Sequence, residues 1–110
     1  MERFVTKDIV VIEFNFTNLS ATRRRPALIL ASLSGDDLIV CEITSVIRND
    51  NYVVSLENKD LEFGKLKINS IIRPNRILTI ENSKIIYRFG KLKEEKFNEV
   101  LGKLRGIFKI

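Results

Sequence analysis

Histidine and tryptophan are both absent from this 110-residue sequence. Histidine is the usual general base near neutral pH and the commonest zinc ligand, so its absence removes the most familiar forms of acid–base catalysis and of zinc binding. The single cysteine, Cys41, cannot form an intramolecular disulfide, which is typical of a protein from a reducing compartment. We therefore expect a cytoplasmic protein with no metal site and no cofactor.

Long apolar runs are missing as well. No segment approaches the roughly 20 apolar residues of a membrane-spanning helix, and the charged N-terminus lacks the apolar region of a secretory signal. The composition, with 45% apolar and 30% charged residues, is that of a globular chain. We expect one domain over residues 1–110 that makes no contact with a membrane.

Negative charge is scarce only in the last quarter of the chain. Residues 1–83 carry eleven Lys or Arg and eleven Asp or Glu, whereas residues 84–110 carry eight basic and three acidic residues, which gives the formal net charge of +5. A basic balance favours anionic partners, above all nucleic acid. The sharpest local cluster is the run of three arginines at residues 23–25, which leads directly into Pro26.

Alternating apolar residues predict short strands through most of the chain. Glycine and proline mark the turns: Gly35 can supply the positive φ of a tight hairpin, and Pro26, which has no N–H, suits the first position of a strand. The connection over residues 58–67 carries no clear pattern. The segments expected to be extended are residues 8–16, 27–33, 38–44, 52–56, 66–72 up to a break at Pro74, 77–80 (or a single helical turn there) and 85–89 up to Gly90.

From Lys93 the period changes to that of an amphipathic helix. The apolar stripe consists of Phe97, Val100, Leu101, Leu104, Ile107 and Phe108. About six short strands followed by one helix predict a mainly β protein with a C-terminal α-helix. Strands this short shield an apolar face best in a small closed or half-closed barrel that the helix plugs.

Five segments, taken in order along the chain, resemble the PemK/MazF toxins. They are KDIVVIEFNFTNLSATRRRPALIL (residues 7–30), VCEITS (40–45), VSLE (54–57), SIIRPNRILTI (70–80) and FGKLKEEKFNEV (89–100). The resemblance covers nearly the whole chain and implies an SH3-like β-barrel with a C-terminal helix. It further implies a type II toxin–antitoxin toxin, a homodimeric, metal-independent endoribonuclease that cuts single-stranded RNA, inhibits translation and growth, and is silenced by a cognate antitoxin.

The resemblance also implies site residues. Arg25 matches the family's arginine before the proline, Thr44 and Ser45 match its Thr-Ser pair, and Arg73 matches an arginine that some members use in catalysis. RNA brings its own nucleophile, the 2′-hydroxyl, so such a site must supply alignment and positive charge rather than a metal. We therefore predict Arg25, Thr44 and Arg73 as catalytic residues. The residues predicted to bind RNA are Arg23, Arg24, Ser45, Asn75 and Arg76.

Four positions depart from the family pattern, and one of them is Asn15, where a proline often sits. Lys7 stands where a glycine is common, Leu78 where an arginine is frequent, and Asn75 where many members carry an aspartate. An amide cannot exchange a proton as a carboxyl group does, so a proton relay through Asn75 does not follow from the sequence.

Other interpretations compete with the enzyme. Arg25 can merely pair with Glu13 or Glu42, and Arg73 can be a solvent-facing base. The same fold can serve a toxin that binds nucleic acid or a topoisomerase without catalysis, or a structural barrel whose basic helix docks on an acidic partner. For an antitoxin, charge complementarity predicts an acidic segment laid across residues 23–25.

Overall fold

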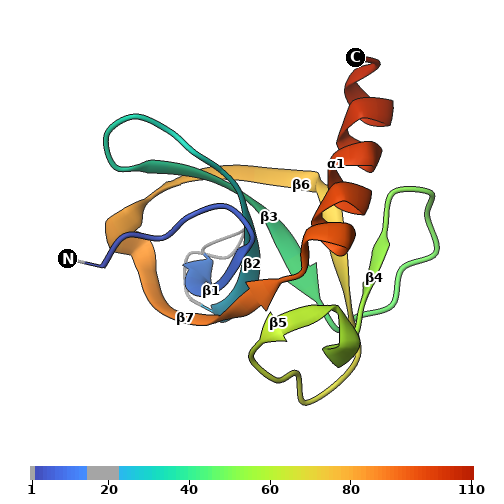
Figure 1. Cartoon of the computed structure of the whole chain (residues 1–110), viewed down its shortest axis with the longest axis horizontal. Helices are drawn as coiled ribbons and strands as arrows, with labels where there is room; N and C mark the ends of the chain where they lie inside the picture. Colours follow the sequence, from blue (N-terminus) through green and yellow to red (C-terminus); the bar gives the residue numbers. More distant parts are fainter. Residues whose placement is uncertain (1, 15–22) are drawn as a thin grey trace.

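The computed structural model describes residues 2–14 and 23–110, and over this part the chain is a curled antiparallel sheet with one long helix (Figure 1). The predicted class, mainly β with a C-terminal α-helix, is confirmed. In chain order the elements are β1 (Asp8–Phe14), β2 (Arg23–Ser32), β3 (Asp37–Thr44), β4 (Val54–Leu56), the 3-10 helix η1 (Asn58–Asp60), β5 (Leu61–Phe63), β6 (Ser70–Glu81), the 3-10 helix η2 (Asn82–Lys84), β7 (Ile85–Leu92) and α1 (Glu94–Phe108).

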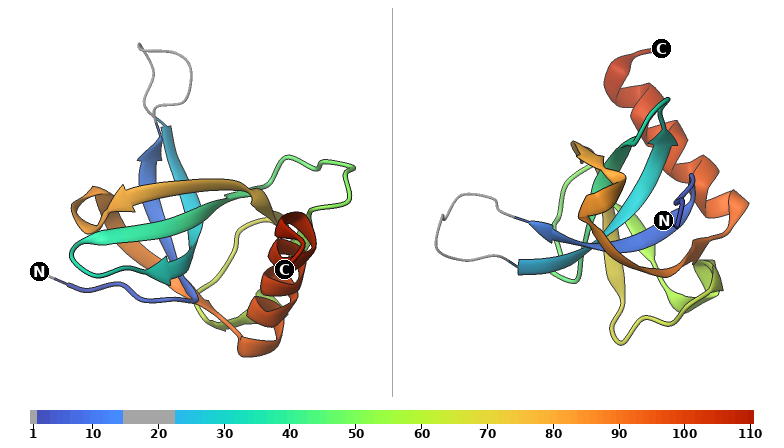
Figure 2. Two further views of the ribbon diagram at one scale, coloured as in Figure 1. Left: turned by 90° about the horizontal axis from the view of Figure 1, so that it is seen from above. Right: turned by 90° about the vertical axis from the view of Figure 1, so that its left-hand side faces the viewer.

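The strands form one sheet in the order β4-β6-β3-β2-β1-β7-β5, with every neighbouring pair antiparallel. The sheet curls into a half-barrel, and α1 runs along one side of it, as the two views of Figure 2 show. This curl is the barrel that the strand pattern predicted. Within the described residues, no helix combines the length and the apolar character needed to cross a membrane.

Residues on the two faces of the central strands belong to two core clusters. Leu28 of β2 packs in the cluster that includes Phe97 and Val100 of α1, whereas its neighbours Ala27 and Ile29 belong to the other cluster. All three β2 side chains are fully buried. Each large apolar side chain buried in this way contributes about 1.5–3 kcal/mol, so the strand and helix stripes hold the half-barrel together from both sides.

β6 continues through Pro74, where the sequence predicted a break. Cys41 of β3 pairs with Ile77, but the next residue, Glu42, pairs with Arg73. Residues 74–76 therefore bulge out of the ladder, and a bulge is one of the few places where a sheet tolerates a proline. The bulge bends β6 so that one long strand replaces the two short segments that were expected.

Further boundaries differ from the predicted ones, among them the start of β4 at Val54 in place of residue 52. β2 begins before Pro26, which residues 23–26 allow because they pair only with β1. β7 runs on through Gly90, and residues 66–69 precede the strand that was expected to include them. β5 lies in the connection that had no predicted structure. Residues 15 and 16, expected to end the first strand, lie outside the described part.

Lys7 adopts the left-handed conformation, with φ at +76°. This explains why a glycine is common at the corresponding position of the family that the sequence resembles. The Lys7 ammonium group lies 2.6 Å from Oε2 of Glu94 at the start of α1. At the predicted hairpin, Gly35 has φ at +82°, as expected.

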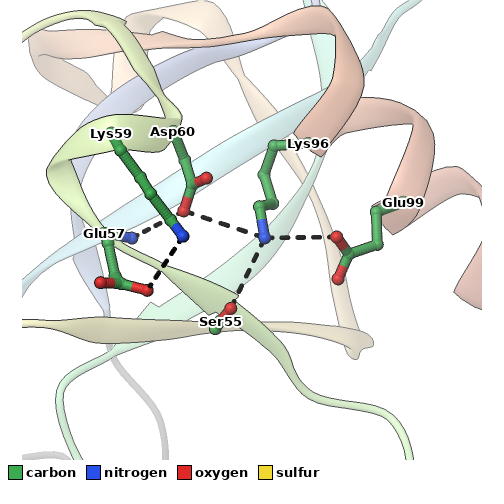
Figure 3. A network of polar contacts seen from close by, with 6 residues as sticks. All are labelled: Ser55, Glu57, Lys59, Asp60, Lys96 and Glu99. Carbon is green, nitrogen blue, oxygen red and sulfur yellow. Dashed lines mark hydrogen bonds and ion pairs between the residues drawn. The ribbon is translucent and has the colours of Figure 1, made fainter.

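An ion network centred on the largely buried Lys96 and Asp60 ties α1 to the barrel (Figure 3). Nζ of Lys96 lies 3.8 Å from Oδ2 of Asp60, 3.2 Å from Oε1 of Glu99 and 3.5 Å from Oγ of Ser55. The same Asp60 oxygen accepts a hydrogen bond from the Glu57 backbone N–H at 2.9 Å. The Lys96 side chain is only 13% exposed, and its ammonium group is paired with the carboxylates of Asp60 and Glu99.

Candidate functional site

A cavity of about 590 Å³ opens where β2 and β3 meet the loop that follows β5. Its lining is basic and apolar, and it includes no Asp or Glu of the described residues. The lining residues are Val11, Arg24, Arg25, Pro26, Ile43, Thr44, Ser45, Val46, Lys65, Leu66, Lys67, Ile68, Ser70, Tyr87 and Phe89. A surface of this character suits a ligand with negative charge and apolar parts.

A row of cross-strand neighbours forms part of the cavity floor. Tyr87 of β7 pairs with Val11 of β1, and Val11 pairs with Pro26 of β2. Directly paired residues project from the same face of a sheet, so these three side chains lie side by side across three strands. The row spans about 10 Å, because neighbouring strands lie about 4.8 Å apart.

Two glycines place the loop that forms the opposite wall. Gly64 has φ at +100°, and a Cβ there would lie 2.7 Å from the carbonyl oxygen of Phe89. A Cβ on Gly90 would lie 2.6 Å from the carbonyl oxygen of Phe63. The backbones of the loop and of β7 therefore touch, and a side chain at either position would separate them.

An asparagine side chain fixes the same loop further along. Oδ1 of Asn58 accepts a hydrogen bond from the Leu66 N–H at 2.7 Å, and Nδ2 of Asn58 donates to the Leu66 carbonyl oxygen at 3.4 Å. Leu66 is buried, whereas Lys65, Lys67 and Ile68 on either side of it are exposed. The loop is thus held in place while three of its side chains remain at the cavity.

Four basic residues line the cavity: Arg24, Arg25, Lys65 and Lys67. None of them forms an ion pair or a hydrogen bond with the described part of the chain, although the strand register places Glu13 opposite Arg24. The segment 15–22 contains no Asp or Glu that could act as a partner. Unneutralised positive charge in a concave site attracts anions.

Arg25 has a buried donor. Its Nε atom is inaccessible to solvent and makes no hydrogen bond within the described part of the structure. Pairing of Arg25 with Glu13 or Glu42, the structural alternative that the sequence allowed, is not observed. A buried donor without an acceptor is costly, so the Nε atom of Arg25 is available to an acceptor that the described residues do not supply; Nε of Arg73 and of Arg88 is also buried without a hydrogen bond in this part of the chain.

Thr44 and Ser45 line the same cavity as Arg25. Thr44 is buried at the end of β3, and its Oγ1 accepts a hydrogen bond from the Val46 N–H at 3.1 Å. A hydroxyl group has one donor hydrogen besides its acceptor lone pairs. The Thr44 hydroxyl hydrogen is therefore left to donate to another group.

Arg73 has a different environment. It is only 8% exposed, so it is not a solvent-facing base. Nη1 of Arg73 lies 3.5 Å from Oε1 of Glu42, and Nη2 lies 4.0 Å from Oδ2 of Asp50. Glu42 is also buried, and its other oxygen lies 3.9 Å from Nε of Arg76. Arg73 is thus held by carboxylates of the chain.

The strand register relates Arg73 to Arg25. Ala27 pairs with Glu42, which pairs with Arg73, and Arg25 lies two positions from Ala27 on the same strand. The two arginines therefore project from the same face, with Cα atoms about 12 Å apart by ordinary strand spacings. Arg73 does not line the cavity, and its role at the phosphate stays a prediction.

The remaining predicted residues divide as follows. Arg24 lines the cavity, whereas the bulge residues Asn75 and Arg76 do not. Arg23 is the first residue of β2, and its side chain lies outside the described part. The sequence reasoning missed Lys65, Lys67, Ile68, Tyr87 and Phe89. The alternating lysines of GKLK were a usable signal for the two lysines, but nothing in the sequence joined that loop to β7.

Cys41 takes no part in the site. It is fully buried in the core beside α1, as expected from its apolar neighbours. Burial raises the pKa of its thiol, and the charge of Glu42 adds to the effect. The thiol is therefore protonated and unreactive in the folded chain. In the described residues, no cluster of acidic residues and cysteine is arranged to hold a metal ion.

Fold and site together define a small half-barrel with a C-terminal helix and a cavity lined by basic and apolar residues. A family model described as the PemK-like, MazF-like toxin of type II toxin–antitoxin systems matches residues 6–108. The chain belongs to this family. The comparison with curated protein sequences gave no match.

Solved structures share the fold at low sequence identity. An endoribonuclease in complex with its cognate antitoxin, from a mycobacterial species, superimposes with a TM-score of 0.79 at 12% identity and covers 98% of this chain and 97% of its own. The Mycobacterium tuberculosis toxin MazF-mt6 gives 0.75 at 17% identity, covering 94% and 97%. A MazE–MazF crystal structure from Deinococcus radiodurans gives 0.77 at 18% identity, covering 96% of each chain.

Proposed function

We propose that this toxin-family chain is an endoribonuclease that cleaves single-stranded RNA without a metal ion and thereby inhibits translation and growth. The observation that carries the proposal is the meeting of Arg25, with its unsatisfied buried donor, and Thr44, with its free hydroxyl hydrogen, in a cavity that lacks acidic residues. Solved relatives of the same fold that are named endoribonucleases support it.

The reaction needs little from the protein beyond placement and charge. The 2′-oxygen of the substrate attacks the adjacent phosphorus, the bond to the 5′-oxygen breaks, and a 2′,3′-cyclic phosphate and a 5′-hydroxyl are formed. The 2′-hydroxyl proton passes to solvent, and the leaving 5′-oxygen takes a proton from solvent. Donors aimed at the phosphoryl oxygens stabilise the charge that develops in the transition state.

Arg25 and Thr44 fit this role as donors. The planar guanidinium group of Arg25 can donate to two phosphate oxygens at once, and the Thr44 hydroxyl can donate to a third position. With a pKa above about 12, an arginine is a poor base, so Arg25 acts by hydrogen bonding and charge. Arg24 and Ser45 bind the flanking RNA backbone.

Arg73 enters the proposal as a second cation. It faces the same side of the sheet as Arg25, but its guanidinium group is held by Glu42 and Asp50. It therefore contributes positive potential from its present position, and direct contact requires the phosphate to displace a carboxylate. Arg23, Asn75 and Arg76 complete the proposed RNA-binding set at the margin of the site.

Incubation of the purified chain with single-stranded RNA in EDTA tests the activity. We expect new ends with 5′-hydroxyl and 2′,3′-cyclic phosphate groups, and their loss in Arg25→Ala. Arg105→Ala, which removes an exposed arginine of α1, is the matched control and should cleave like the wild type. Cleavage that persists in Arg25→Ala would overturn the assignment of the site.

A toxin of this fold that binds nucleic acid or a topoisomerase without cutting is the second candidate. It is favoured by Asn75, which supplies an amide on the bulge of β6 rather than a proton-transferring carboxyl group. The same incubation separates the two candidates, because RNA that is retarded in a gel but intact would indicate a binder.

The partners proposed from the sequence are a second copy of the chain and an acidic antitoxin, both in the cytoplasm. The unpaired basic residues of the cavity would attract an acidic antitoxin segment. Co-expression with the small acidic protein of a neighbouring reading frame should restore growth, and sedimentation of the purified chain should show a dimer. If co-expression of such a protein does not relieve growth arrest, inhibition by an acidic antitoxin is contradicted.

A further inference from the structure

The cavity extends well beyond Arg25 and Thr44, and its far end is aromatic. Tyr87 and Phe89 of β7 line this end together with Ile68 of the opposite loop. Tyr87 is 49% exposed and Ile68 is 63% exposed. The described residues thus leave a tyrosine ring and a large aliphatic side chain accessible in the cavity that four unpaired basic residues also line.

We propose that Tyr87 is a stacking platform for one unpaired nucleobase of the RNA. The inference rests on the proposed function, because it names the part of the substrate that binds at the far end of the same cavity. Every base has an aromatic face, and stacking on a protein aromatic ring is the common way to hold single-stranded nucleic acid.

The dimensions of the floor suit this arrangement. Tyr87 and Pro26 are two strands apart, joined through Val11 in one row. Arg24 projects from the same face of β2 as Pro26, and Arg25 projects from the opposite face. A base on Tyr87 therefore lies about 10 Å along the sheet from the strand that carries Arg25. A base at that distance belongs to a nucleotide near the scissile phosphate but not directly at it. Tyr87 therefore contributes to RNA binding and to sequence preference.

The loop on the other side supplies charge at the same end. Lys65 and Lys67 flank the buried Leu66, which Asn58 holds in position. Both lysines are exposed and have no carboxylate partner among the described residues. They are placed to meet the phosphates on either side of the stacked base, while Ile68 packs against its edge.

An oligonucleotide fits this surface better than an acidic peptide does. An acidic peptide would pair with the four basic residues but would leave the row of Tyr87, Val11 and Pro26 without a flat apolar partner. Only a ligand that repeats an anionic backbone and an aromatic ring at short intervals matches both parts. Single-stranded RNA has this repeat.

Fluorine NMR provides a direct test, because the chain contains only two tyrosines, Tyr52 and Tyr87. Tyr52 lies in the loop before β4 and does not line the cavity. In full-length protein labelled with 3-fluorotyrosine, Tyr52→Phe assigns the two signals. The probes are short single-stranded 2′-O-methyl oligonucleotides of random sequence, which lack the attacking hydroxyl and cannot be cleaved, and abasic oligonucleotides of the same length.

We expect the base-containing oligonucleotide to shift the Tyr87 signal, and the abasic oligonucleotide to leave it in place. The Tyr52 signal should not move with either. Tyr87→Phe should bind the base-containing probe like the wild type, whereas Tyr87→Ala should bind it about 5- to 100-fold more weakly, as for the loss of one stacked base. Binding of the abasic probe should be equal in all three proteins.

Three results would overturn the proposal. One is a Tyr87 signal that moves equally with both probes, which would reflect the backbone alone. Another is a signal that responds to polyglutamate and not to the oligonucleotide, which would assign the surface to an acidic protein. The third is a Tyr87→Ala protein that binds the base-containing probe normally but sediments as a smaller species, which would make the surface an interface between copies.

The test is independent of cleavage. A shift of Tyr87 with uncleavable probe, in a protein that cuts no RNA, would support the stacking site and refute the nuclease. Cleavage with unchanged Tyr87 signal and normal binding by Tyr87→Ala would do the reverse. Unfolding curves of the two Tyr87 variants, which remove only half-exposed side-chain surface, confirm that each remains folded.

Discussion

Basic residues occur in two contrasting settings in this half-barrel. Arg73 and Lys96 are largely buried, and each lies within 4 Å of two carboxylate groups of the chain. Arg25 and Lys65 line an open cavity, where the described residues provide no carboxylate partner. The first setting joins segments that are distant in sequence, and the second leaves its charge available.

The difference shows which positive charges can serve a ligand. A buried cation that already has carboxylate partners stabilises the fold only if those partners stay in place, and its removal leaves a buried negative charge. A cation without partners contributes little to the fold and attracts anions. If this distinction is correct, substitutions in the two settings will affect different measurements.

The largest expected effect is on stability, from Arg73→Met. Among the described residues, the substitution leaves the buried Glu42 with Arg76 as its one cationic partner, at 3.9 Å. We expect the free energy of unfolding to fall by about 3–5 kcal/mol, measured by chemical denaturation, as for a broken buried pair.

A second substitution provides the control for Arg73→Met. Glu42→Gln removes the negative charge that Arg73→Met leaves without its partner. The double variant should therefore recover part of the lost free energy of unfolding, and the comparison gives a coupling energy between the two sites. A purely additive double variant would mean that Arg73 does not stabilise the fold through Glu42.

The next effect is on catalysis, from Arg25→Gln. Loss of one well-placed donor to the transition state lowers a rate by about 100- to 1,000-fold, so RNA cleavage should fall by that factor. The free energy of unfolding should change by less than about 0.5 kcal/mol, because no partner is lost. A large loss of stability without loss of cleavage would place Arg25 among the structural cations.

Lys96→Met should lower the free energy of unfolding by about 1–3 kcal/mol, because Asp60 loses the ammonium group that partly neutralises it. Cleavage by the folded fraction should be unchanged, since Lys96 lies outside the cavity. Lys103→Met on the same helix is the matched control, because within the described part of the chain its Nζ donates to the carbonyl oxygen of Asn51 and pairs with no carboxylate. Equal losses in both variants would show that the ion network adds nothing to packing.

The smallest effect concerns the salt dependence of RNA binding. Each phosphate neutralised on a single strand contributes about 0.7 to the slope of log affinity against log salt concentration. Lys65→Gln and Lys67→Gln should each lower the slope by about that amount, in titrations with uncleavable oligonucleotide. Lys103→Gln should leave the slope unchanged, and a decrease there would show that the charge acts through the whole molecule rather than through the cavity.

Most of the fold could be predicted because periodicity reports burial directly. The stripe of α1 and the alternation in β1 and β3 require no knowledge of distant residues. Pro74 and Gly90 were misleading because both residues usually end strands, and only the pairing with β3 and the close approach of Gly64 show why the strands continue. Such long-range contacts leave no mark in the local sequence.

The site could be predicted only where its residues stand at strand ends. Arg25 and Thr44 meet because β2 and β3 are neighbours, and the family resemblance already joined them. Lys65 and Tyr87 are brought together by a loop after β5, an element that the sequence did not reveal. The partners of Arg73 also depended on register, since Glu42 reaches it only through the bulge in β6.

The contact between Gly64 and Gly90 has a consequence for protein engineering. Because the close main-chain approach at Gly64 and Gly90, the Asn58 side chain and the buried Leu66 hold the loop, its position does not depend on the exposed side chains that flank Leu66. Lys65, Lys67 and Ile68 can therefore be exchanged as a set while the scaffold is kept. A library varied at these three positions, with both glycines retained, is a compact starting point for changing the RNA sequences that such a toxin prefers.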